Sequence, residues 1–334
     1  MVKVAINGFG RIGRLALRML VDHSELQLVA INSNGSVESS AHLFKYDSTY
    51  GPWKGTVETK ENTLIVNGKH IRYSQEREPQ NLPWADLQVD LVIDCTGKFT
   101  DREKAILYQQ VGVKKVLLSA PGKKEDVTLV MGVNEHMYDP KEHYLISNAS
   151  CTTNCLAPVA KVLHDTFGIE KGLMTTVHAY TNDQVTLDKS HKDLRRARAA
   201  ALSIIPTTTG AAKSLSLVIP ALKGKLNGLA LRVPTPTVSV VDLVVETSKP
   251  VTKESVNAAF AQAAATNLKG ILDITNDPVV SVDLKGSDYS SIVDADLTMV
   301  IGENQVKVIA WYDNEWGYTC RLCEMAAFIA AKGF

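Results

Sequence analysis

The chain has 334 residues, more than a single hydrophobic core usually organises, so we expect two domains. Acidic and basic residues balance at 36 each, and no charge block stands out, which argues against a nucleic-acid-binding protein or one attracted to anionic membranes. No segment approaches the ~18 apolar residues of a membrane span, no secretory signal precedes the first strand, and five cysteines are an odd number, so we expect a cytoplasmic protein without a disulfide framework.

The first half alternates strand-like segments rich in β-branched residues with helix-like ones. Between 50 and 80 the alternation breaks, and Asn67-Gly68 predicts a tight hairpin turn within the same domain. The alternation itself predicts a parallel sheet covered by helices. Strands are expected at 2–6, 26–31 (followed by a loop), 91–95, 114–120 and 143–150, and a helix near 101–112.

After residue 150 the strand-like segments become longer. They lie at 172–179, 228–233, 238–247, 297–301 and 305–312, with helices near 210–219 and 253–268. This pattern predicts an α+β domain on a mostly antiparallel sheet, so the fold class is α/β with a Rossmann-type parallel sheet domain and a second, α+β domain. The last segment, 319–332, is helix-like, with one apolar face formed by Leu322, Met325, Ala326 and Ile329.

A glycine pattern follows the first strand and opens the first helix. Gly8 allows a tight turn, Gly10 lets the backbone approach a pyrophosphate, and Gly13 lets the helix meet the strand. The start of the helix adds unpaired N–H groups that bind anions. We interpret the pattern as a dinucleotide site, with a ligand-free glycine turn as the alternative.

The second strand lacks the carboxylate that normally binds the ribose 2′-hydroxyl of NAD. The chain reads Asn32-Ser33-Asn34 at this strand end. One interpretation is a neutral change in a turn-rich loop. The other is that the 2′-phosphate of NADP is no longer repelled.

The segment 147–155 joins a strand to an apolar-periodic helix and contains the candidate nucleophile. Ser150 is a plausible N-cap, which places Cys151 in the first helical turn, where the helix dipole favours the thiolate. Pro158 falls early in this helix and is expected to disturb it. Cys151 and Cys155 lack further ligands for a metal, so we expect no metal site.

The other thiols have structural interpretations, since Cys95 lies in a buried-looking strand and Cys320 and Cys323 in the final helix. His178 is the candidate base because it ends a hydrophobic strand and opens a polar loop, although a buried structural histidine fits the same pattern. The histidines expected to be solvated are His23, His70, His136, His143 and His191.

Nine motifs along almost the whole chain resemble those of the phosphorylating glyceraldehyde-3-phosphate dehydrogenase family. They are INGFGRIGR (6–14), KYDSTYG (45–51), SNASCTTNC (147–155), TTVHAYTNDQ (175–184), HKDLRRARAA (191–200), IIPTTTGAAK (204–213), LKGKLNG (222–228), LRVPTPTVSVVDLV (231–244) and WYDNEWGY (311–318). The third and fourth motifs, which hold Cys151 and His178, are the most specific.

The resemblance implies that Cys151 attacks the aldehyde of glyceraldehyde 3-phosphate and that His178 accepts the proton as hydride leaves for the coenzyme. Inorganic phosphate then resolves the thioacyl enzyme. Two phosphate sites are implied. The substrate phosphate is assigned to Thr181, Asp183, Arg196 and Arg232, and the attacking phosphate to Ser150, Thr152, Thr209 and Gly210.

The resemblance also implies a coenzyme set, a domain division and an assembly. Residues 1–150 with a C-terminal helix at 316–334 form the dinucleotide-binding domain, 151–315 form the catalytic domain, and four chains form a homotetramer in which the loop after His178 approaches a neighbour's coenzyme. The coenzyme residues are Asn7, Gly8, Phe9, Gly10, Arg11, Ile12, Gly13, Asn32, Ser33, Arg77, Thr96, Gly97, Ser119, Ser190, Asn314 and Tyr318.

Two loops resemble the NADP-accepting branch of the family. Asn32-Ser33 stands where strictly NAD-dependent members have Asn-Asp, and Lys189-Ser190 stands where they have Leu-Pro. We therefore expect NADP to be used alongside NAD or in preference to it.

Three rival functions stay open. An erythrose-4-phosphate dehydrogenase is separated by comparing kcat/KM for the two aldehyde phosphates. A non-phosphorylating aldehyde dehydrogenase is separated by leaving phosphate out of the assay. A non-catalytic nucleotide-binding regulator would be expected to have lost Cys151, His178 or Arg232, and all three are present.

Overall fold

Two sheets organise the chain in the computed structural model, which describes residues Met1–Phe334. They lie in separate units. The first unit comprises Met1–Leu129, Glu135–Ala149 and Thr319–Phe334, and the second comprises Val130–Asn134 and Ser150–Tyr318. None of the helices combines the length and apolar character needed to cross a lipid bilayer.

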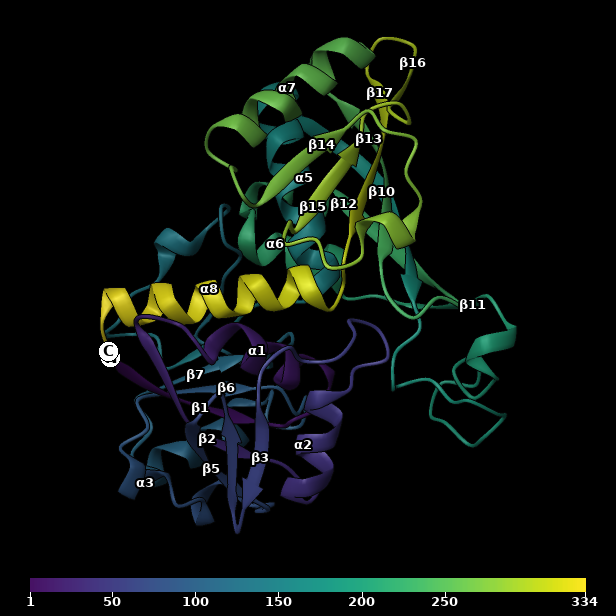
Figure 1. The fold of residues 1–334 in the computed structure, drawn as a ribbon. Coiled ribbons are helices and arrows are strands. Elements are labelled where there is room, and N and C mark those ends of the chain that lie inside the picture. The colour runs from purple at the N-terminus through teal and green to yellow at the C-terminus, as the bar shows by residue number, and fades with distance from the viewer. The chain divides into compact units, whose positions relative to one another are not determined.

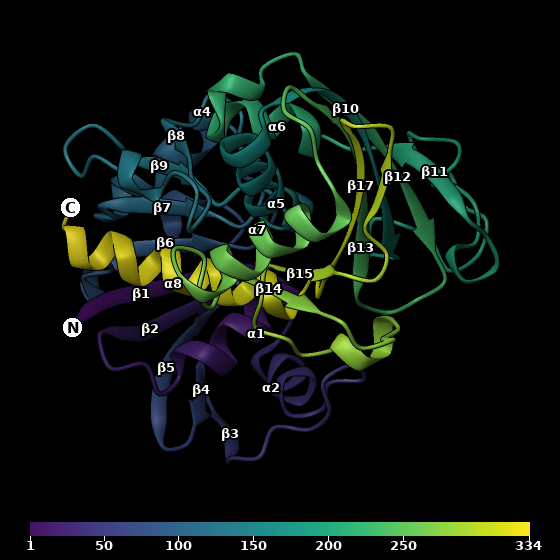
Figure 2. The same ribbon diagram turned by 90° about the horizontal axis from the view of Figure 1, so that it is seen from above.

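The first unit contains a nine-stranded sheet in the order β3-β4-β5-β2-β1-β6-β7-β9-β8, which can be followed in Figure 2. From β5 to β8 every pairing is parallel, as predicted, while β3, β4 and β5 pair antiparallel. The strands are β1 (Val2–Asn7), β2 (Leu26–Asn32), β3 (Val57–Lys60), β4 (Thr63–Val66), β5 (Lys69–Ser74), β6 (Leu91–Asp94), β7 (Lys115–Leu118), β8 (Val127–Thr128) and β9 (Leu145–Ser147).

The hairpin between β4 and β5 is confirmed at the predicted dipeptide. Asn67 has φ 50° and Gly68 has φ 74°, so both central residues adopt the left-handed conformation that a tight hairpin turn requires. Asparagine and glycine are the residues that adopt this conformation at least cost.

Helices of the first unit depart from the predictions at two places. Helix α2 (Val37–Lys45) lies where a loop was expected, and its start is capped by Ser36 Oγ, which accepts a hydrogen bond from Ser39 N at 3.2 Å. The helix expected near 101–112 is α-helical only over α4 (Arg102–Ala105) and continues as the tighter 3₁₀ segment η2 (Ile106–Val111).

The other helices of this unit are α1 (Arg11–Leu20), α3 (Trp84–Leu87) and most of α8 (Trp316–Lys332), with short 3₁₀ turns η1 (Pro79–Asn81) and η3 (Glu135–Met137). The predicted apolar face of the last helix is confirmed, because Leu322, Met325, Ala326 and Ile329 are fully buried. Figure 1 shows α8 in yellow running past α1. Tyr138 Oη fixes its end by donating to the carbonyl oxygen of Gly333 at 3.1 Å.

The second unit contains a mixed sheet in the order β11-β12-β10-β13-β17-β15-β14, with β16 paired to β17. Only β10 with β12 and β14 with β15 pair parallel, so the sheet is mostly antiparallel, as predicted. The strands are β10 (Ile169–Ala179), β11 (Ile205–Thr208), β12 (Leu226–Val233), β13 (Ser239–Thr247), β14 (Leu272–Thr275), β15 (Ser291–Asp294), β16 (Met299–Ile301) and β17 (Gln305–Tyr312).

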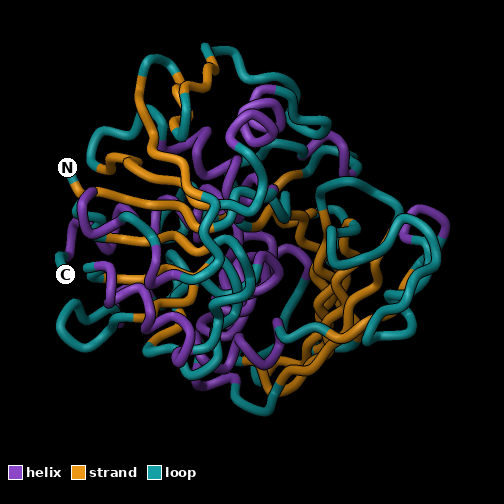
Figure 3. Tube along the Cα trace, turned by 90° about the horizontal axis from the view of Figure 1, so that it is seen from below, coloured by secondary structure: helices purple, strands orange, loops and turns teal.

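Three helices pack along this sheet, and Figure 3 shows them in purple beside the orange strands. Helix α5 (Cys151–Phe167) contacts β10, β13, β15 and β17, while α6 (Ala211–Val218) contacts β12 and α7 (Lys253–Ala265) contacts β14. Three 3₁₀ turns complete the unit: η4 (Ala200–Leu202), η5 (Pro220–Leu222) and η6 (Ser281–Leu284).

The start of α5 follows the sequence analysis closely. Ser150 is the N-cap, since its Oγ accepts a hydrogen bond from Thr153 N at 3.0 Å, and Cys151 is the first helical residue. Pro158 lies inside the helix, which continues through it to Phe167. The predicted disturbance therefore does not end the helix.

A short segment that the sequence analysis placed in the first domain, Val130–Asn134, belongs to the second unit. A Cβ atom on Gly132 would lie 2.6 Å from Ile271 Cδ1 and 2.8 Å from Leu268 Cδ2. The backbone of Gly132 therefore lies close against Ile271 and Leu268 of the second unit, and a side chain there would collide with them.

Candidate active site

The glycine pattern follows β1 directly, at the carboxyl end of that strand. β1 pairs with β2 on one side and with β6 on the other, so the order of the strands reverses its direction at β1. Ligands bind at such switch points, at the carboxyl ends of parallel strands. Gly8 has φ +93°, and a Cβ there would lie 2.8 Å from Thr96 N, so the loops after β1 and β6 meet. A Cβ on Gly13 would lie 2.1 Å from Gly8 O, whereas nothing approaches Gly10 within 4 Å.

This arrangement suits a pyrophosphate. Gly8 and Gly13 are required by close backbone approaches, while the backbone at Gly10 stays open beside the first turn of α1. Gly10 is the N-cap of α1 and no side chain caps that helix end. The Arg11 guanidinium pairs with Asp47 at 2.5 Å, so its side chain is engaged within the protein.

Asn32 organises the loops beside the open end of β2. Its side-chain nitrogen donates to Asn7 Oδ1 and to Glu76 O, both at 2.8 Å, and its oxygen accepts from Glu76 N at 2.9 Å. The amide is therefore engaged inside the protein and holds the loop that carries Arg77 next to Ser33. Ser33 N also donates to Ser74 O at 3.0 Å, whereas the side chain of Arg77 is exposed.

A buried carboxyl group that the sequence analysis missed lies beneath this edge of the sheet. Asp94 accepts hydrogen bonds from Tyr108 Oη at 2.6 Å and from Thr96 Oγ1 at 2.7 Å. Burial raises the pKa of Asp94 above its ordinary value. Asp94 thus fixes the loop that holds Thr96 and Gly97, and Ser119 follows the neighbouring β7 at the same edge.

In the second unit the candidate nucleophile and base are brought together. Cys151 Sγ lies 3.4 Å from His178 Nε2, which is hydrogen-bond distance for sulfur. Cys151 begins α5, and His178 is the penultimate residue of β10 and is 4% exposed. His178 is therefore buried at the site and does not project into the polar loop that follows it.

The electrostatics give the two groups different protonation states. Burial, together with the positive charge of Arg232, lowers the pKa of His178 to about 3, so its ring is neutral at physiological pH. Burial raises the pKa of the Cys151 thiol, while Arg232 acts in the opposite direction. The expected thiolate preference is therefore outweighed by desolvation, and the thiol must transfer its proton when it attacks.

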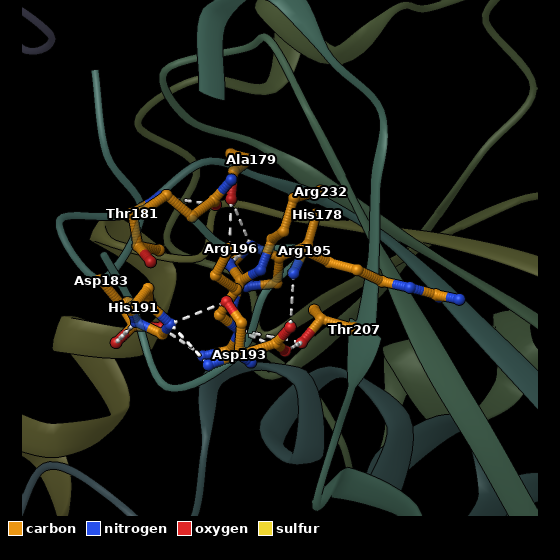
Figure 4. Close-up of polar contacts among 11 residues, drawn as sticks. His178, Ala179, Thr181, Asp183, His191, Asp193, Arg195, Arg196, Thr207 and Arg232 are labelled. Atoms are coloured by element: carbon orange, nitrogen blue, oxygen red, sulfur yellow. Dashed lines mark hydrogen bonds and ion pairs between the residues drawn. The ribbon is translucent and has the colours of Figure 1, made fainter. Parts of the chain in front are cut away.

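Arg232 stands across from His178 in the parallel pairing of β10 with β12. Its Nη1 lies 2.6 Å from His178 Nδ1 and 3.0 Å from Ala179 O. Its Nε is buried without a hydrogen-bond partner. Figure 4 shows Arg232 and His178 next to each other.

A second polar group of the same unit surrounds Arg196, as Figure 4 also shows. The Arg196 Nε donates to Thr207 Oγ1 at 2.8 Å, its Nη1 pairs with Asp183, and Asp193 lies 3.6 Å away. The charge of Arg196 lowers the pKa of Arg232, and the charge of Asp183 raises it. Three of the predicted substrate-phosphate residues are thus gathered, and Thr181 begins the same loop.

The residues assigned to the attacking phosphate lie at two helix starts. Ser150 caps α5, and Gly210 is the N-cap of α6, with Thr209 Oγ1 accepting from Ala211 N at 3.2 Å. Thr152 is 4% exposed and its hydroxyl lies 2.9 Å from Tyr312 Oη. Its hydroxyl therefore also contacts the core of the unit, through Tyr312.

Tyr312 is a site residue that the sequence analysis missed. Its hydroxyl also lies 2.8 Å from Thr176 Oγ1, and its ring packs edge-on against that of His178 at 6.0 Å. It thereby links the start of α5 to β10. One signal in the sequence could have found Tyr312. It lies on the alternating buried face of β17, just before the Asp313-Asn314 turn.

Asn314 is 6% exposed and its Oδ1 accepts a hydrogen bond from Ser239 Oγ at 2.8 Å. Tyr318 is 5% exposed, whereas Ser190 is exposed in the loop that follows β10.

His191 was expected to be solvated, but its Nδ1 accepts from Asp193 N at 3.0 Å and its side chain is only 22% exposed.

Comparison with known proteins assigns a family to both units. Residues 2–102 match the family described as "Glyceraldehyde 3-phosphate dehydrogenase, NAD binding domain" and residues 150–314 match "Glyceraldehyde 3-phosphate dehydrogenase, C-terminal domain". The chain belongs to the glyceraldehyde-3-phosphate dehydrogenase family. The predicted resemblance is confirmed.

Members of this family with curated names are similar over the whole chain. Glyceraldehyde-3-phosphate dehydrogenase of Geobacillus stearothermophilus is 59% identical over 332 residues, covering 99% of both chains. Glyceraldehyde-3-phosphate dehydrogenase A, chloroplastic, of Zea mays is 58% identical over 333 residues, 98% of this chain and 82% of the relative. Glyceraldehyde-3-phosphate dehydrogenase 2 of Trichormus variabilis is 56% identical over 335 residues, 99% of each.

Three of the other thiols of this glyceraldehyde-3-phosphate dehydrogenase family member, those of Cys95, Cys155 and Cys323, have their pKa raised by burial. Burial raises the pKa of Cys95 and of Cys155 to about 12. Cys155 lies only 3.5 Å from Ser291 Oγ, inside the second unit, and Cys323 is buried. Cys151, by contrast, has a histidine nitrogen at hydrogen-bond distance.

Proposed function

We propose that this chain is a phosphorylating glyceraldehyde-3-phosphate dehydrogenase that oxidises glyceraldehyde 3-phosphate to 1,3-bisphosphoglycerate reversibly through a thioacyl intermediate on Cys151. The observation that carries the proposal is the contact sequence from Cys151 Sγ to His178 Nε2 and from His178 Nδ1 to Arg232 Nη1. It joins a nucleophile, a neutral base and a cation for a phosphate in one site.

The first step follows from the protonation states. The Cys151 sulfur bonds to the aldehyde carbon while its proton passes to Nε2 of the neutral His178. The backbone N–H of Cys151, at the start of α5, and His178 stabilise the resulting oxyanion. Loss of hydride from the same carbon leaves a thioester on Cys151.

The coenzyme is a nicotinamide dinucleotide, and the residues present fit it. Gly8, Gly10 and Gly13 form the cradle in which two positions exclude any side chain and the third is open. When bound, the nicotinamide accepts the hydride. Asn314, fixed by Ser239, is the proposed partner of its carboxamide, and Tyr318 packs beside the ring.

Phosphate chemistry completes the reaction. Arg232 with Thr181, Asp183 and Arg196 binds the substrate phosphate, because a guanidinium gives charge-assisted hydrogen bonds. The N–H groups at the start of α6, with Thr209 and Gly210, hold the attacking phosphate together with Ser150 and Thr152. Its oxygen attacks the thioester carbon, which releases the Cys151 sulfur and forms the acyl phosphate.

We also propose that NADP is used well. Ser33 offers a hydroxyl where a carboxylate would repel the 2′-phosphate, and Asn32 holds the loop of Arg77 beside it. Arg77 is exposed and supplies the positive charge. Ser190 and Lys189, on the loop after His178, are the proposed contribution of a neighbouring chain.

A homotetramer is the proposed assembly. Apolar side chains on β10, β12 and the loop after β10 face solvent in the single chain: Leu173, Leu187, Leu194, Leu202, Ile204 and Leu229. Such a set supports an interface with copies of the chain. A mass four times the 36.4 kDa of the chain, in analytical ultracentrifugation, is the expected result, and a monomer contradicts it.

We also propose two functional domains, one formed by residues 1–150 with 316–334 and the other by residues 151–315.

The cytoplasm is the proposed location, because all five cysteines are free thiols.

A steady-state assay tests the activity. We expect coenzyme reduction with glyceraldehyde 3-phosphate to depend on inorganic phosphate, and Arg232→Ala to raise KM for this substrate much more than for unphosphorylated glyceraldehyde. Higher kcat/KM for erythrose 4-phosphate, turnover without phosphate, or coenzyme binding without turnover would each favour one of the three rival functions.

A further inference from the structure

Three neighbouring strands of the first unit end in polar residues that lie in one row. Strands β2, β1 and β6 run side by side (Figure 2) and end at Asn32, Asn7 and Asp94, which are register partners. Side chains of register partners on adjacent strands point to the same face of a sheet. All three are buried, at 5%, 3% and 2% exposure. Together with the buried Tyr108 they form a row of hydrogen-bonded side chains, which we call the strand-end ladder.

The backbone of Glu76 sets the direction of the hydrogen bonds in this ladder. Its N–H donates to Asn32 Oδ1 at 2.9 Å and its carbonyl oxygen accepts from Asn32 Nδ2 at 2.8 Å, so the orientation of this amide is fixed. Asn32 Nδ2 also donates to Asn7 Oδ1 at 2.8 Å. The nitrogen of Asn7 therefore points the other way and donates to Tyr108 Oη and, at 3.3 Å, to Asp94 Oδ2. Since Tyr108 accepts from Asn7, its own hydrogen goes to Asp94 Oδ2 at 2.6 Å.

Asp94 is the acceptor at the end of the ladder. Its second oxygen, Oδ1, accepts from Thr96 N at 2.9 Å and from Thr96 Oγ1 at 2.7 Å. The Thr96 hydroxyl itself accepts from Lys98 N at 3.0 Å, so its hydrogen is directed at Asp94. Both carboxyl oxygens thus face donors, and an ionised carboxylate is the group that accepts on both. One acceptor at this end matches the direction of every bond back to Glu76.

An amide in place of this carboxylate cannot satisfy the ladder. In Asp94→Asn the amide oxygen is required by Thr96 N, so the new NH₂ group faces the donor nitrogen of Asn7. Rotating the amide of Asn7 moves the conflict to Asn32, and rotating Asn32 breaks both of its bonds to Glu76. A change at the end of β6 is therefore transmitted to the loop after β5.

That loop is the one proposed to bind the 2′-phosphate. Glu76 precedes Arg77, whose side chain is exposed, and Ser33 N is tied to Ser74 O at 3.0 Å. The glycine cradle depends on different bonds, because Gly8 N donates to the backbone oxygen of Asn32 at 2.8 Å. Side-chain changes in the ladder leave this backbone bond in place. The ladder therefore acts on the adenosine end of the coenzyme more than on its pyrophosphate.

We propose that Asp94 is a positioning residue that determines coenzyme specificity, because as the terminal acceptor of the ladder it holds the Glu76–Arg77 loop where Arg77 binds the 2′-phosphate of NADP. This inference rests on the proposed use of NADP and adds a buried residue of another strand to Ser33 and Arg77. A carboxylate that is 2% exposed thereby raises the affinity for NADP relative to NAD.

Equilibrium binding separates this role from a merely structural one. In isothermal titration calorimetry of the full chain, we expect Asp94→Asn to raise the Kd of NADP about tenfold or more and that of NAD less than about threefold. Adenosine 2′,5′-bisphosphate and AMP, which contain only the adenosine end, should show the same difference. A loss that is equal for the two coenzymes or greater for NAD overturns the proposal, and so does the absence of any loss.

Two further variants provide the comparison. Asp126→Asn makes the same change at another carboxyl group of this unit, which pairs with Arg102 and accepts from Tyr144 N and Leu145 N. It is expected to keep the wild-type ratio of the two Kd values even where it lowers stability. Tyr108→Phe removes one bond to Asp94 without adding an opposing donor, so it should raise the Kd of NADP alone, by about threefold. If Asp94→Asn does not fold, an unchanged ratio in Tyr108→Phe overturns the proposal.

Wild type supplies the reference for the proposed function. If it does not bind NADP, the coenzyme proposal fails and this inference fails with it. If it binds NADP and both ladder variants keep its ratio of Kd values, only this inference fails. Phosphate-dependent reduction of NAD by wild type decides the dehydrogenase activity independently of either result.

Discussion

His178 and Arg232 are register partners across β10 and β12, although 54 residues separate them in the chain. Their side chains therefore leave the same face of the sheet at adjacent strands. The start of α5 brings Cys151 to the opposite nitrogen of the same ring. One imidazole thus lies between a nucleophile and a cation, and this arrangement underlies the first predictions.

Replacing the nucleophile is expected to abolish turnover without unfolding the protein. Cys151→Ser should keep coenzyme binding while kcat falls by at least ~10³-fold, because serine is a much weaker nucleophile in this setting. Cys155→Ala is the matched control, since Cys155 is buried and its sulfur lies 3.5 Å from Ser291 Oγ, and it should retain activity. Mass spectrometry after limited iodoacetate treatment should find Cys151 labelled first. Dominant labelling of another thiol with activity retained would contradict the assignment.

Removing the base is expected to slow hydride transfer and spare coenzyme affinity. His178→Asn should lose ~10²–10⁴-fold in the single-turnover rate, the usual contribution of a general base. His70→Asn, an exposed histidine, is the control. A rate near that of wild type in His178→Asn would remove His178 from the mechanism.

His178 also makes folding depend on pH. Its pKa is about 3 when folded and ~6.5 in an unfolded chain, so the unfolded state binds more protons between these values. The stability of wild type should therefore fall relative to His178→Asn as the pH drops from 6.5 to 4.5, by roughly 2 kcal/mol. Denaturant unfolding of both proteins at equal concentration measures the difference. A difference that does not vary with pH would mean that the folded ring titrates normally.

Much of the scaffold was predictable from the sequence because its signals are local. The glycine pattern, the Asn67-Gly68 turn and the N-cap at Ser150 each depend on a few consecutive residues. Helix α2 was missed although Val37, Ala41 and Phe44 are buried at helical spacing, because this short segment directly follows the turn-rich Asn32–Ser36. The short strands β11, β14 and β15, of four residues each, give too little pattern to detect.

The contacts that tune the site were not predictable, because they join distant segments. No local signal shows that β10 pairs with β12 in the register that sets Arg232 against His178. The same holds for Tyr312, which meets Thr152 and Thr176 through tertiary packing. The net effect of burial on the pKa of Cys151 likewise depends on what surrounds the helix start.

The hydroxyl contacts of Tyr312 are expected to matter for both stability and rate. Tyr312→Phe keeps the ring against His178 but leaves the buried Thr152 and Thr176 hydroxyls without this partner, which should cost ~1–3 kcal/mol of unfolding free energy. We expect kcat to fall more than coenzyme affinity, since the link between α5 and β10 is loosened. Denaturant unfolding and single-turnover kinetics measure the two effects. Wild-type stability together with wild-type kcat would show that the contacts contribute nothing.

Coenzyme choice gives the last prediction. Wild type should use NADP with a kcat/KM no more than about a hundredfold below that for NAD, a gap of ~2.7 kcal/mol. Ser33→Asp places a carboxylate at the end of β2, beside the loop that Asn32 holds through Glu76, and this charge would repel the 2′-phosphate. It should raise KM for NADP and leave KM for NAD unchanged or lower. Ser39→Asp adds the same charge on the exposed first turn of α2 and is expected to change NADP use much less. Equal effects of both substitutions would indicate a general field effect, and a wild-type preference for NAD beyond the hundredfold limit would refute the coenzyme proposal while leaving the dehydrogenase activity in place.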